Sequence, residues 1–386
     1  MLTKEGCRRR VGRLRDWCHS QDVDLAVISH DREIYYFSSF LRKPFGWLTT
    51  RLAIWACAAG GETLLLCSES ERRTAADVLA DHVVTYKDYS IEGTTQTFLE
   101  HALPALREAL QRLRLPVRRI ALEKRYAQVA LQEALAALYP GAQFVDAAEP
   151  VLGMRKRKDP DEVVALRKTA GLSGFCYMTA GDAIEPGRKD IDIYAACYEA
   201  YVRKMGEYVT FAGDYLAGED TVKVTGGPSG RLLEPGQTMI LDLWIDPYGY
   251  WADNARTFIV GPRPSRDQER LYDLAITAIQ HGEKCLVPGA RGSGIYDEVR
   301  GVFDREGMAA HFPGHAGHGL GLSPHEAPLF IPGSTDVVEE GDVVTLEPGL
   351  YVPGIGGVRC EDNYVITAGG PKRLTDFERK IRWYKE

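Results

Sequence analysis

Two segments in the second half of the chain constrain its fold most, because each has the pattern of two strands joined by a turn. Residues 238–260, TMILDLWIDPYGYWADNARTFIV, place apolar runs on both sides of Pro247-Tyr248-Gly249, a sequence suited to a turn. Residues 343–367 repeat this pattern about the flexible, glycine-rich stretch 354–357. With helical segments between them, these ribbons predict an α+β arrangement of antiparallel strands covered by helices.

Each ribbon carries two carboxylates placed almost symmetrically about its turn. Asp242 and Asp253 flank the first turn, and Glu347 and Glu361 flank the second. Across neighbouring strands such partners can face each other with Cβ atoms about 5 Å apart. Two carboxylates at that separation repel each other unless a proton or a cation lies between them. A metal ion is the simplest explanation for both pairs.

A glycine-rich segment between the ribbons, residues 311–328, supplies His315, His318 and His325. Imidazole is the commonest nitrogen ligand of metals, and glycine lets the backbone approach a ligand closely. A carboxylate pair or a single histidine is by itself more often structural. The ordered set of four carboxylates and one histidine instead favours two divalent ions, Mn²⁺, Co²⁺, Fe²⁺ or Zn²⁺, about 3–4 Å apart.

The first 150 residues alternate helix-like and strand-like segments, which predicts an α/β domain with a mixed or largely parallel sheet. The expected helices are 5–20, 70–81, 98–113 and 126–138, and the expected strands are 24–29, 52–59, 62–67 and 118–123. The aromatic stretch 34–40, IYYFSSF, could line a pocket, but a buried strand is favoured.

A basic linker, Arg155–Lys158, marks the change between two domains, which we place at residues 1–152 and 153–386. Asp159 is a suitable N-cap and Pro160 suits the first helical position, so a helix should begin there. The helices expected in the second domain are 160–180, 189–206, 265–284 and 292–306.

Composition narrows the classes of function. A net charge of −7 argues against a general nucleic-acid binder, which needs a positive surface. No run of about 18 apolar residues is present, so no membrane span is expected. The eight cysteines are scattered without a C-x-x-C pair, which predicts free thiols and a reducing cytoplasm.

The strings DLWIDPYGYWADNARTF, GHGLGLSPHE, LEPGLY and GVRCED together resemble the creatinase, prolidase and methionine aminopeptidase family, the M24 or pita-bread metallopeptidases. The N-terminal part resembles that of prolidases, aminopeptidase P and creatinase. The resemblance implies an α+β pita-bread catalytic domain over residues 153–386, and a creatinase/prolidase-like α/β domain over residues 1–152. It also implies a homodimer.

The resemblance further implies a role for each site residue. Asp242 should bind one ion, Asp253 and Glu361 should bridge both, and His318 and Glu347 should bind the other. Glu347 should also act as general acid/base. His325 should contact the substrate or tetrahedral intermediate, and Arg359 should contact the substrate or support a ligand. The expected activity is that of an Mn²⁺-dependent Xaa-Pro dipeptidase or aminopeptidase.

Three departures from the family pattern affect the substrate-binding wall. Residues 216–237 contain no histidine, and the candidates for its place are Lys223, Thr225 and Ser229; Tyr215 is a further candidate for the wall. His315 precedes His318 by three residues rather than four, and it is a candidate substrate contact. Trp244 stands two residues after Asp242, where the family usually has glycine.

These departures keep two alternatives open. One is an enzyme of the same fold acting on a small non-peptide metabolite, as ectoine hydrolases, amidinohydrolases and dimethylsulfoniopropionate lyases do. The other is a non-enzymatic binding protein, which the presence of all five ligand-type residues disfavours.

Overall fold

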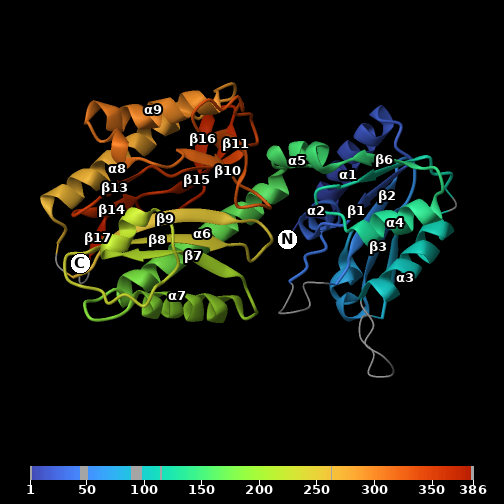
Figure 1. Cartoon of the computed structure of the whole chain (residues 1–386), viewed down its shortest axis with the longest axis horizontal. Coiled ribbons are helices and arrows are strands. Elements are labelled where there is room, and N and C mark those ends of the chain that lie inside the picture. The colour runs from blue at the N-terminus through green and yellow to red at the C-terminus, as the bar shows by residue number, and fades with distance from the viewer. Residues whose placement is uncertain (1, 44–50, 88–97, 114, 262, 384–386) are drawn as a thin grey trace. The chain divides into compact units, whose positions relative to one another are not determined.

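The computed structural model describes residues 2–43, 51–87, 98–113, 115–261 and 263–383. The chain divides into two compact units, Met1–Arg155 and Lys156–Glu386 (Figure 1). The division falls three residues after the boundary proposed from the sequence.

The first unit is built on one six-stranded sheet with the order β4-β3-β2-β1-β5-β6. Its strands are β1 (Leu25–Ile28), β2 (Ile54–Ala58), β3 (Thr63–Ser68), β4 (His82–Tyr86), β5 (Arg119–Leu122) and β6 (Gln143–Asp146). Strand β2 runs antiparallel to both of its neighbours, whereas the β3–β4, β1–β5 and β5–β6 pairs are parallel. The sheet is therefore mixed, as the sequence predicts.

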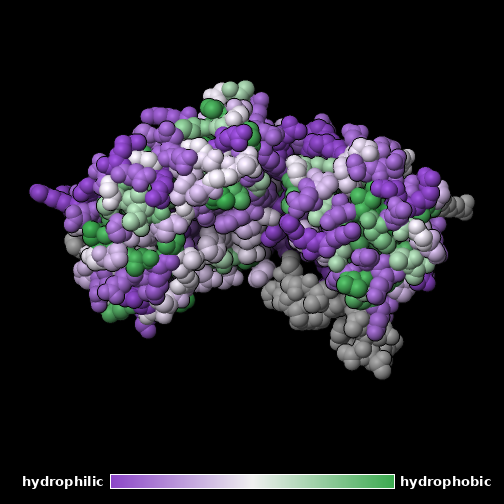
Figure 2. Space-filling model, turned by 45° about the horizontal axis from the view of Figure 1, so that its top comes forward, coloured by the Kyte–Doolittle hydropathy of each residue, from purple (hydrophilic) through white to green (hydrophobic). Residues whose placement is uncertain are grey.

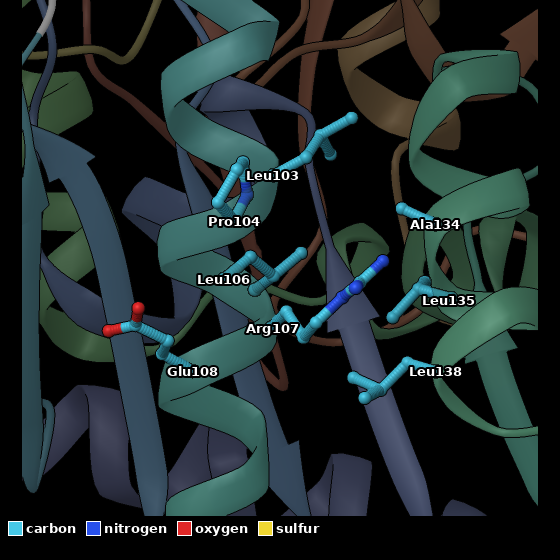
Figure 3. A pocket seen from close by; sticks show the side chains of 8 residues that line it. All are labelled: Leu103, Pro104, Leu106, Arg107, Glu108, Ala134, Leu135 and Leu138. Carbon is cyan, nitrogen blue, oxygen red and sulfur yellow. The ribbon is translucent and has the colours of Figure 1, made fainter.

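Helices cover both faces of this sheet (Figure 1). They are α1 (Lys4–Ser20), α2 (Asp31–Ser38), α3 (Phe98–Arg112), α4 (Val129–Leu138) and α5 (Ala148–Lys156). Leu106 of α3 and Leu135 of α4 join strand residues such as Leu66 in one apolar core. A cavity of about 310 Å³ lies between α3 and α4 (Figure 3), with a mainly apolar lining of Leu103, Pro104, Leu106, Arg107, Glu108, Ala134, Leu135 and Leu138.

Two predictions for this unit are wrong. Residues 34–40 are not a strand, because Ile34–Ser38 belong to helix α2, where acidic Asp31 and Glu33 occupy the first turn and favour the helix start. Its aromatic side chains are buried, as expected, but a short, fully apolar run does not reveal its period. Residues 70–81 form two short 3₁₀ turns, Glu69–Glu71 and Thr74–Asp77, instead of one α-helix.

The second unit begins with helix α6 (Pro160–Ala183), whose start agrees with the prediction. Asp159 is the N-cap residue, and its backbone N–H donates to Glu162 Oε2 at 2.8 Å, as in a capping box. Helix α6 and α7 (Asp190–Met205) pack on a four-stranded sheet through a shared apolar core. The sheet order is β17 (Arg382–Trp383), β9 (Ala252–Ile259), β8 (Thr238–Ile245) and β7 (Phe211–Ala217).

The other half of this unit pairs helices α8 (Arg266–Cys285) and α9 (Gly292–Arg305) with further strands over a second core. A five-stranded sheet runs β11 (Glu326–Phe330), β10 (Gly317–Gly319), β12 (Val343–Leu346), β15 (Asp362–Thr367) and β16 (Gly370–Arg373). Strands β13 (Gly349–Val352) and β14 (Gly356–Arg359) form a separate ribbon. Figure 1 shows the strands of both halves between the two helix pairs, which is the predicted α+β architecture.

Polar residues dominate the face of the molecule shown in Figure 2, with hydrophobic residues in small groups. Within the described residues, no helix combines the length and the apolar character that crossing a membrane requires.

Candidate metal centre

Asp242 and Asp253 lie on adjacent antiparallel strands, β8 and β9. The register pairs Asp242 with Ala255, and Asp253 with Trp244, so the two aspartates are diagonal neighbours rather than direct partners as the sequence suggested. Because side chains alternate along a strand, Asp253 and Ala255 share a face, and both aspartates point to the same side of the ribbon. Both are buried.

Glu347 and Glu361 lie in the gap between the β12–β15 and β13–β14 strand pairings of the second ribbon. Leu346 pairs with Asp362 on one side of the interruption and Gly349 with Arg359 on the other, in the same register. That register puts the two glutamates opposite each other, as their symmetry about the turn predicts. Glu361 is fully buried, and its Oε1 accepts a hydrogen bond from Thr345 Oγ1 at 2.7 Å.

His318 reaches this cluster from β10. Its Nδ1 lies 2.9 Å from the Gly319 carbonyl oxygen, which can only accept, so Nδ1 carries the proton and the Nε2 lone pair is available. Nε2 lies 3.1 Å from Glu347 Oε1 and 3.7 Å from Asp253 Oδ2. The close approach depends on Gly317, where an added Cβ would lie 2.0 Å from the Thr345 carbonyl oxygen.

Burial and mutual repulsion disfavour the ionised forms of Asp242, Asp253 and Glu361. Burial, opposed by Arg359, raises the pKa of Asp242 to about 7. Burial and the neighbouring carboxylates raise the pKa values of Asp253 and Glu361 well above the usual range. Burial also acts to raise the pKa of Glu347, but its contacts with the His315 and His318 rings outweigh burial and lower that pKa.

The donors fit a divalent cation. Ligand atoms of Asp253, His318 and Glu361 all lie within 4.8 Å of one another. Among the described residues, neither His318 Nε2 nor Glu361 Oε2 has a hydrogen-bond partner, although both atoms are buried. Buried polar atoms are normally satisfied, so these two atoms are available to bind a cation. Carboxylates with one imidazole suit Mn²⁺, Fe²⁺, Co²⁺ or Zn²⁺.

The other two predicted histidines line the same cluster. His315 Nε2 lies 2.8 Å from Glu347 Oε1, and this contact raises the pKa of His315 despite burial. The rings of His325 and His318 are 3.8 Å apart. Partial burial and the neighbouring His318 lower the pKa of His325, so this imidazole is neutral at pH 7. It is also 58% exposed, which leaves it accessible to a substrate.

Arg359 contacts Asp242, one of the predicted metal ligands, rather than solvent. Its Nη1 donates to Asp242 Oδ2 at 2.5 Å, and its Nε donates to the Tyr351 hydroxyl at 2.7 Å. The opposite oxygen, Asp242 Oδ1, accepts from the indole N–H of Trp244 at 3.1 Å. Both oxygens of this aspartate are therefore oriented by donors.

The two predicted wall residues Tyr215 and Lys223 differ in their surroundings. Tyr215 pairs with Leu241, on the face of β7 opposite to that of Asp214, and is buried against Tyr194 in the helix-side core. Its predicted role in the wall is therefore corrected, because the alternation of the strand turns it inward. Lys223 is 64% exposed and pairs with Asp220 at 2.5 Å.

Asp214 is a further residue of this region that was not among the predicted site residues. This buried residue of β7 pairs directly with Asp242, and Arg359 Nη1 bridges them, donating to Asp214 Oδ2 at 3.0 Å. The sequence does carry a signal for it: Asp214 is an acidic residue in the middle of the otherwise uncharged strand β7.

Two strand ribbons between helix pairs, with buried carboxylates and a histidine between them, define the pita-bread class of metal-dependent hydrolases. Residues 164–368 match the model of metallopeptidase family M24, and residues 10–157 match that of the creatinase/prolidase N-terminal domain. The chain belongs to metallopeptidase family M24.

Relatives align over almost the whole chain. A putative dipeptidase of Bacillus subtilis is 27% identical over 376 residues, covering 96% of this chain and 99% of its own. The Xaa-Pro dipeptidase of Lactobacillus delbrueckii is 26% identical, covering 96% and 98%. The prolidase structure from Pyrococcus horikoshii shares the fold, with a TM-score of 0.80 at 23% identity, covering 97% and 99%.

Proposed function

We propose that this chain is a dinuclear metal-dependent hydrolase that cleaves the amide bond before proline in a dipeptide or short peptide. Its ligands would be Asp242, Asp253, His318, Glu347 and Glu361, with Mn²⁺ as the expected ion and Co²⁺, Fe²⁺ or Zn²⁺ as alternatives. The observation that carries the proposal is the pair of buried atoms without partners, His318 Nε2 and Glu361 Oε2, among converging carboxylates.

The chain's own residues would divide the chemistry between them. When bound, the ions would lower the pKa of a water and polarise the scissile carbonyl. Glu347 would accept the proton of the attacking water and pass it to the leaving nitrogen. Neutral His325 would donate a hydrogen bond to the carbonyl oxygen as negative charge develops on it.

The direct test is proline release from Xaa-Pro dipeptides by the Mn²⁺-loaded chain, with Xaa-Ala dipeptides as the control. Metal analysis should find about two ions per chain. Asp253→Asn should lower kcat by about 100-fold or more and reduce the metal content, because it replaces a proposed bridging carboxylate. Release of no amino acid from any Xaa-Pro substrate, with either Mn²⁺ or Co²⁺ supplied, refutes the proposed substrate.

A second candidate is an enzyme that acts on a small non-peptide metabolite through the same centre. The observations that favour it are the absence of histidine from residues 216–237 and the place of Trp244 beside Asp242. A panel of ectoine-like, amidine and sulfonium compounds separates the two candidates. Turnover of one of these, with none of Xaa-Pro dipeptides, would favour the second.

We further propose a homodimer and a cytoplasmic location. The family resemblance supports the dimer, and the eight cysteines, all free, suit a reducing compartment. Light scattering that gave a monomer mass of 42.9 kDa would remove the dimer. Fractionation of cells should recover the chain with cytoplasmic markers.

A further inference from the structure

Asp214 is a buried carboxylate with no place in the proposed ligand set. It has 1% of its surface exposed, and it accepts donors on both oxygens. Arg359 Nη1 donates to Oδ2 at 3.0 Å, while Thr225 Oγ1 and the Gly226 N–H donate to Oδ1, each at 2.8 Å. One side chain thus joins the arginine that holds Asp242 to the segment from Val224 to Gly226.

That segment is held in an unusual backbone conformation. Val224 has φ 72° and ψ −46°, which is rare and strained for a β-branched residue. Its carbonyl oxygen accepts a hydrogen bond from Arg359 Nη2. Strained residues persist only where their surroundings fix them, and here Asp214 and Arg359 do so from two sides. The same segment lies in the stretch that has no histidine.

We propose that Asp214 is a positioning residue that fixes the Val224–Gly226 segment and the metal ligand Asp242 relative to each other through Arg359. The inference rests on the proposed metal centre and on this segment forming part of the substrate-binding wall. Asp214 and Asp242 are direct partners in the β7–β8 ladder, so the strands set their spacing. The guanidinium between them is then confined to one position.

Charge supports the same role. A single guanidinium lies between two buried carboxylates, so its positive charge is shared. Without the Asp214 charge, Arg359 would pair with Asp242 alone and compete more strongly with a cation for that carboxylate. Partners of metal ligands typically change metal affinity by about 10- to 100-fold when they are replaced.

The experiment compares Asp214→Asn with Thr225→Val and Thr225→Ser in the full chain. Mn²⁺ affinity is measured by titration calorimetry, and kcat and KM are measured on an Xaa-Pro dipeptide. Asp214→Asn should weaken one Mn²⁺ site by about 10-fold or more and raise KM. Thr225→Val loses only the contact of the segment, so KM should rise by about 3- to 10-fold with unchanged Mn²⁺ affinity. Thr225→Ser keeps the hydroxyl that donates to Asp214, so its Mn²⁺ affinity should match that of the wild type and its KM should stay below that of Thr225→Val.

Unchanged Mn²⁺ affinity in Asp214→Asn would overturn the proposal, as would a lowered melting temperature with wild-type affinity and kinetics. Should Asp214→Asn fail to fold, equal KM values for Thr225→Val and wild type would overturn it. A wild type that binds Mn²⁺ but cleaves no Xaa-Pro peptide refutes the proposed substrate alone, because the affinity comparison still decides on Asp214. A wild type that binds no ion overturns both.

Discussion

At the scale of single residues, Trp244 stands where the family usually has glycine, and we expect it to affect the affinity for Mn²⁺. Its indole N–H donates to Asp242 Oδ1, and a donor of this kind stabilises the ionised carboxylate. In Trp244→Phe the pKa of Asp242 should rise further, so an ion must displace a proton more often. We expect Mn²⁺ affinity at pH 7 to fall by about 2- to 10-fold.

The deficit of Trp244→Phe should shrink when affinity is measured at pH 9, because the proton no longer competes. Trp251→Phe is the matched control, since that indole donates to the Leu322 carbonyl oxygen. A deficit of equal size at both pH values would contradict the explanation.

The carboxylate cluster also predicts how the stability of the metal-free chain depends on pH. Unfolded carboxyls are ionised above about pH 4.5, whereas folded Asp242 keeps its proton up to about pH 7. The folded state therefore binds more protons, and its stability must fall as the pH rises through this window. Between pH 5.5 and 8 we expect a loss of about 2 kcal/mol or more in the free energy of unfolding.

Urea denaturation at several pH values measures this loss, and saturating Mn²⁺ should flatten the dependence because bound ligands have already lost their protons. A metal-free chain that becomes more stable from pH 5.5 to 8 would show that the carboxylates are ionised without a cation.

Residue types alone predicted which side chains would converge, but not how they are oriented. The convergence of Asp253, His318 and Glu361 could be predicted, because the glycines and the symmetry of the strands about their turns are visible in the sequence. The sequence suggested Asp253 as the cross-strand partner of Asp242, whereas the partner is Ala255, two residues further on. The reason is that the loop from residue 246 to 251 is centred one residue later than expected. Asp214 was missed because its partners become visible only once β7 is placed beside β8.

At the scale of elements, the tight contact between β10 and β12 sets the position of His318. Gly317→Ala would place a Cβ 2.0 Å from the Thr345 carbonyl oxygen, at a φ of 154°. The strands must separate, so we expect a loss of at least about 2 kcal/mol in stability and weaker Mn²⁺ binding.

Gly314→Ala is the control for Gly317→Ala, because its added Cβ meets nothing within 4 Å. It should change stability by less than about 0.5 kcal/mol. Chemical denaturation of both variants measures the difference, and equal stabilities would show that the β10–β12 contact is adaptable.

Helices with clear caps and long periodic patterns could be predicted, and short buried elements could not. Helix α6 starts where Asp159 and Pro160 indicated, since capping chemistry is local. Helix α2 was mistaken for a strand because its side chains are buried on all sides, which removes the period from the sequence. Tertiary burial, rather than local preference, decides such segments.

At the scale of the whole molecule, the two units have separate apolar cores, and the proposed ligands all belong to the second. A ligand stabilises only the folded state that binds it. Calorimetry should therefore resolve two unfolding transitions, of which only one moves to higher temperature with Mn²⁺. A single transition, or an equal shift of two, would show that the units unfold together.

Arg256 gives the far end of the chain an influence on the proposed catalytic centre. From β9 its guanidinium donates to the Glu361 carbonyl oxygen and to the carboxylate of Asp362, and also to the Phe377 and Glu378 carbonyl oxygens. Arg256 thus links the segment around Phe377 to both ribbons that carry the proposed ligands. Shortening the protein before Phe377 should keep every proposed ligand residue in the chain and still weaken the binding of Mn²⁺.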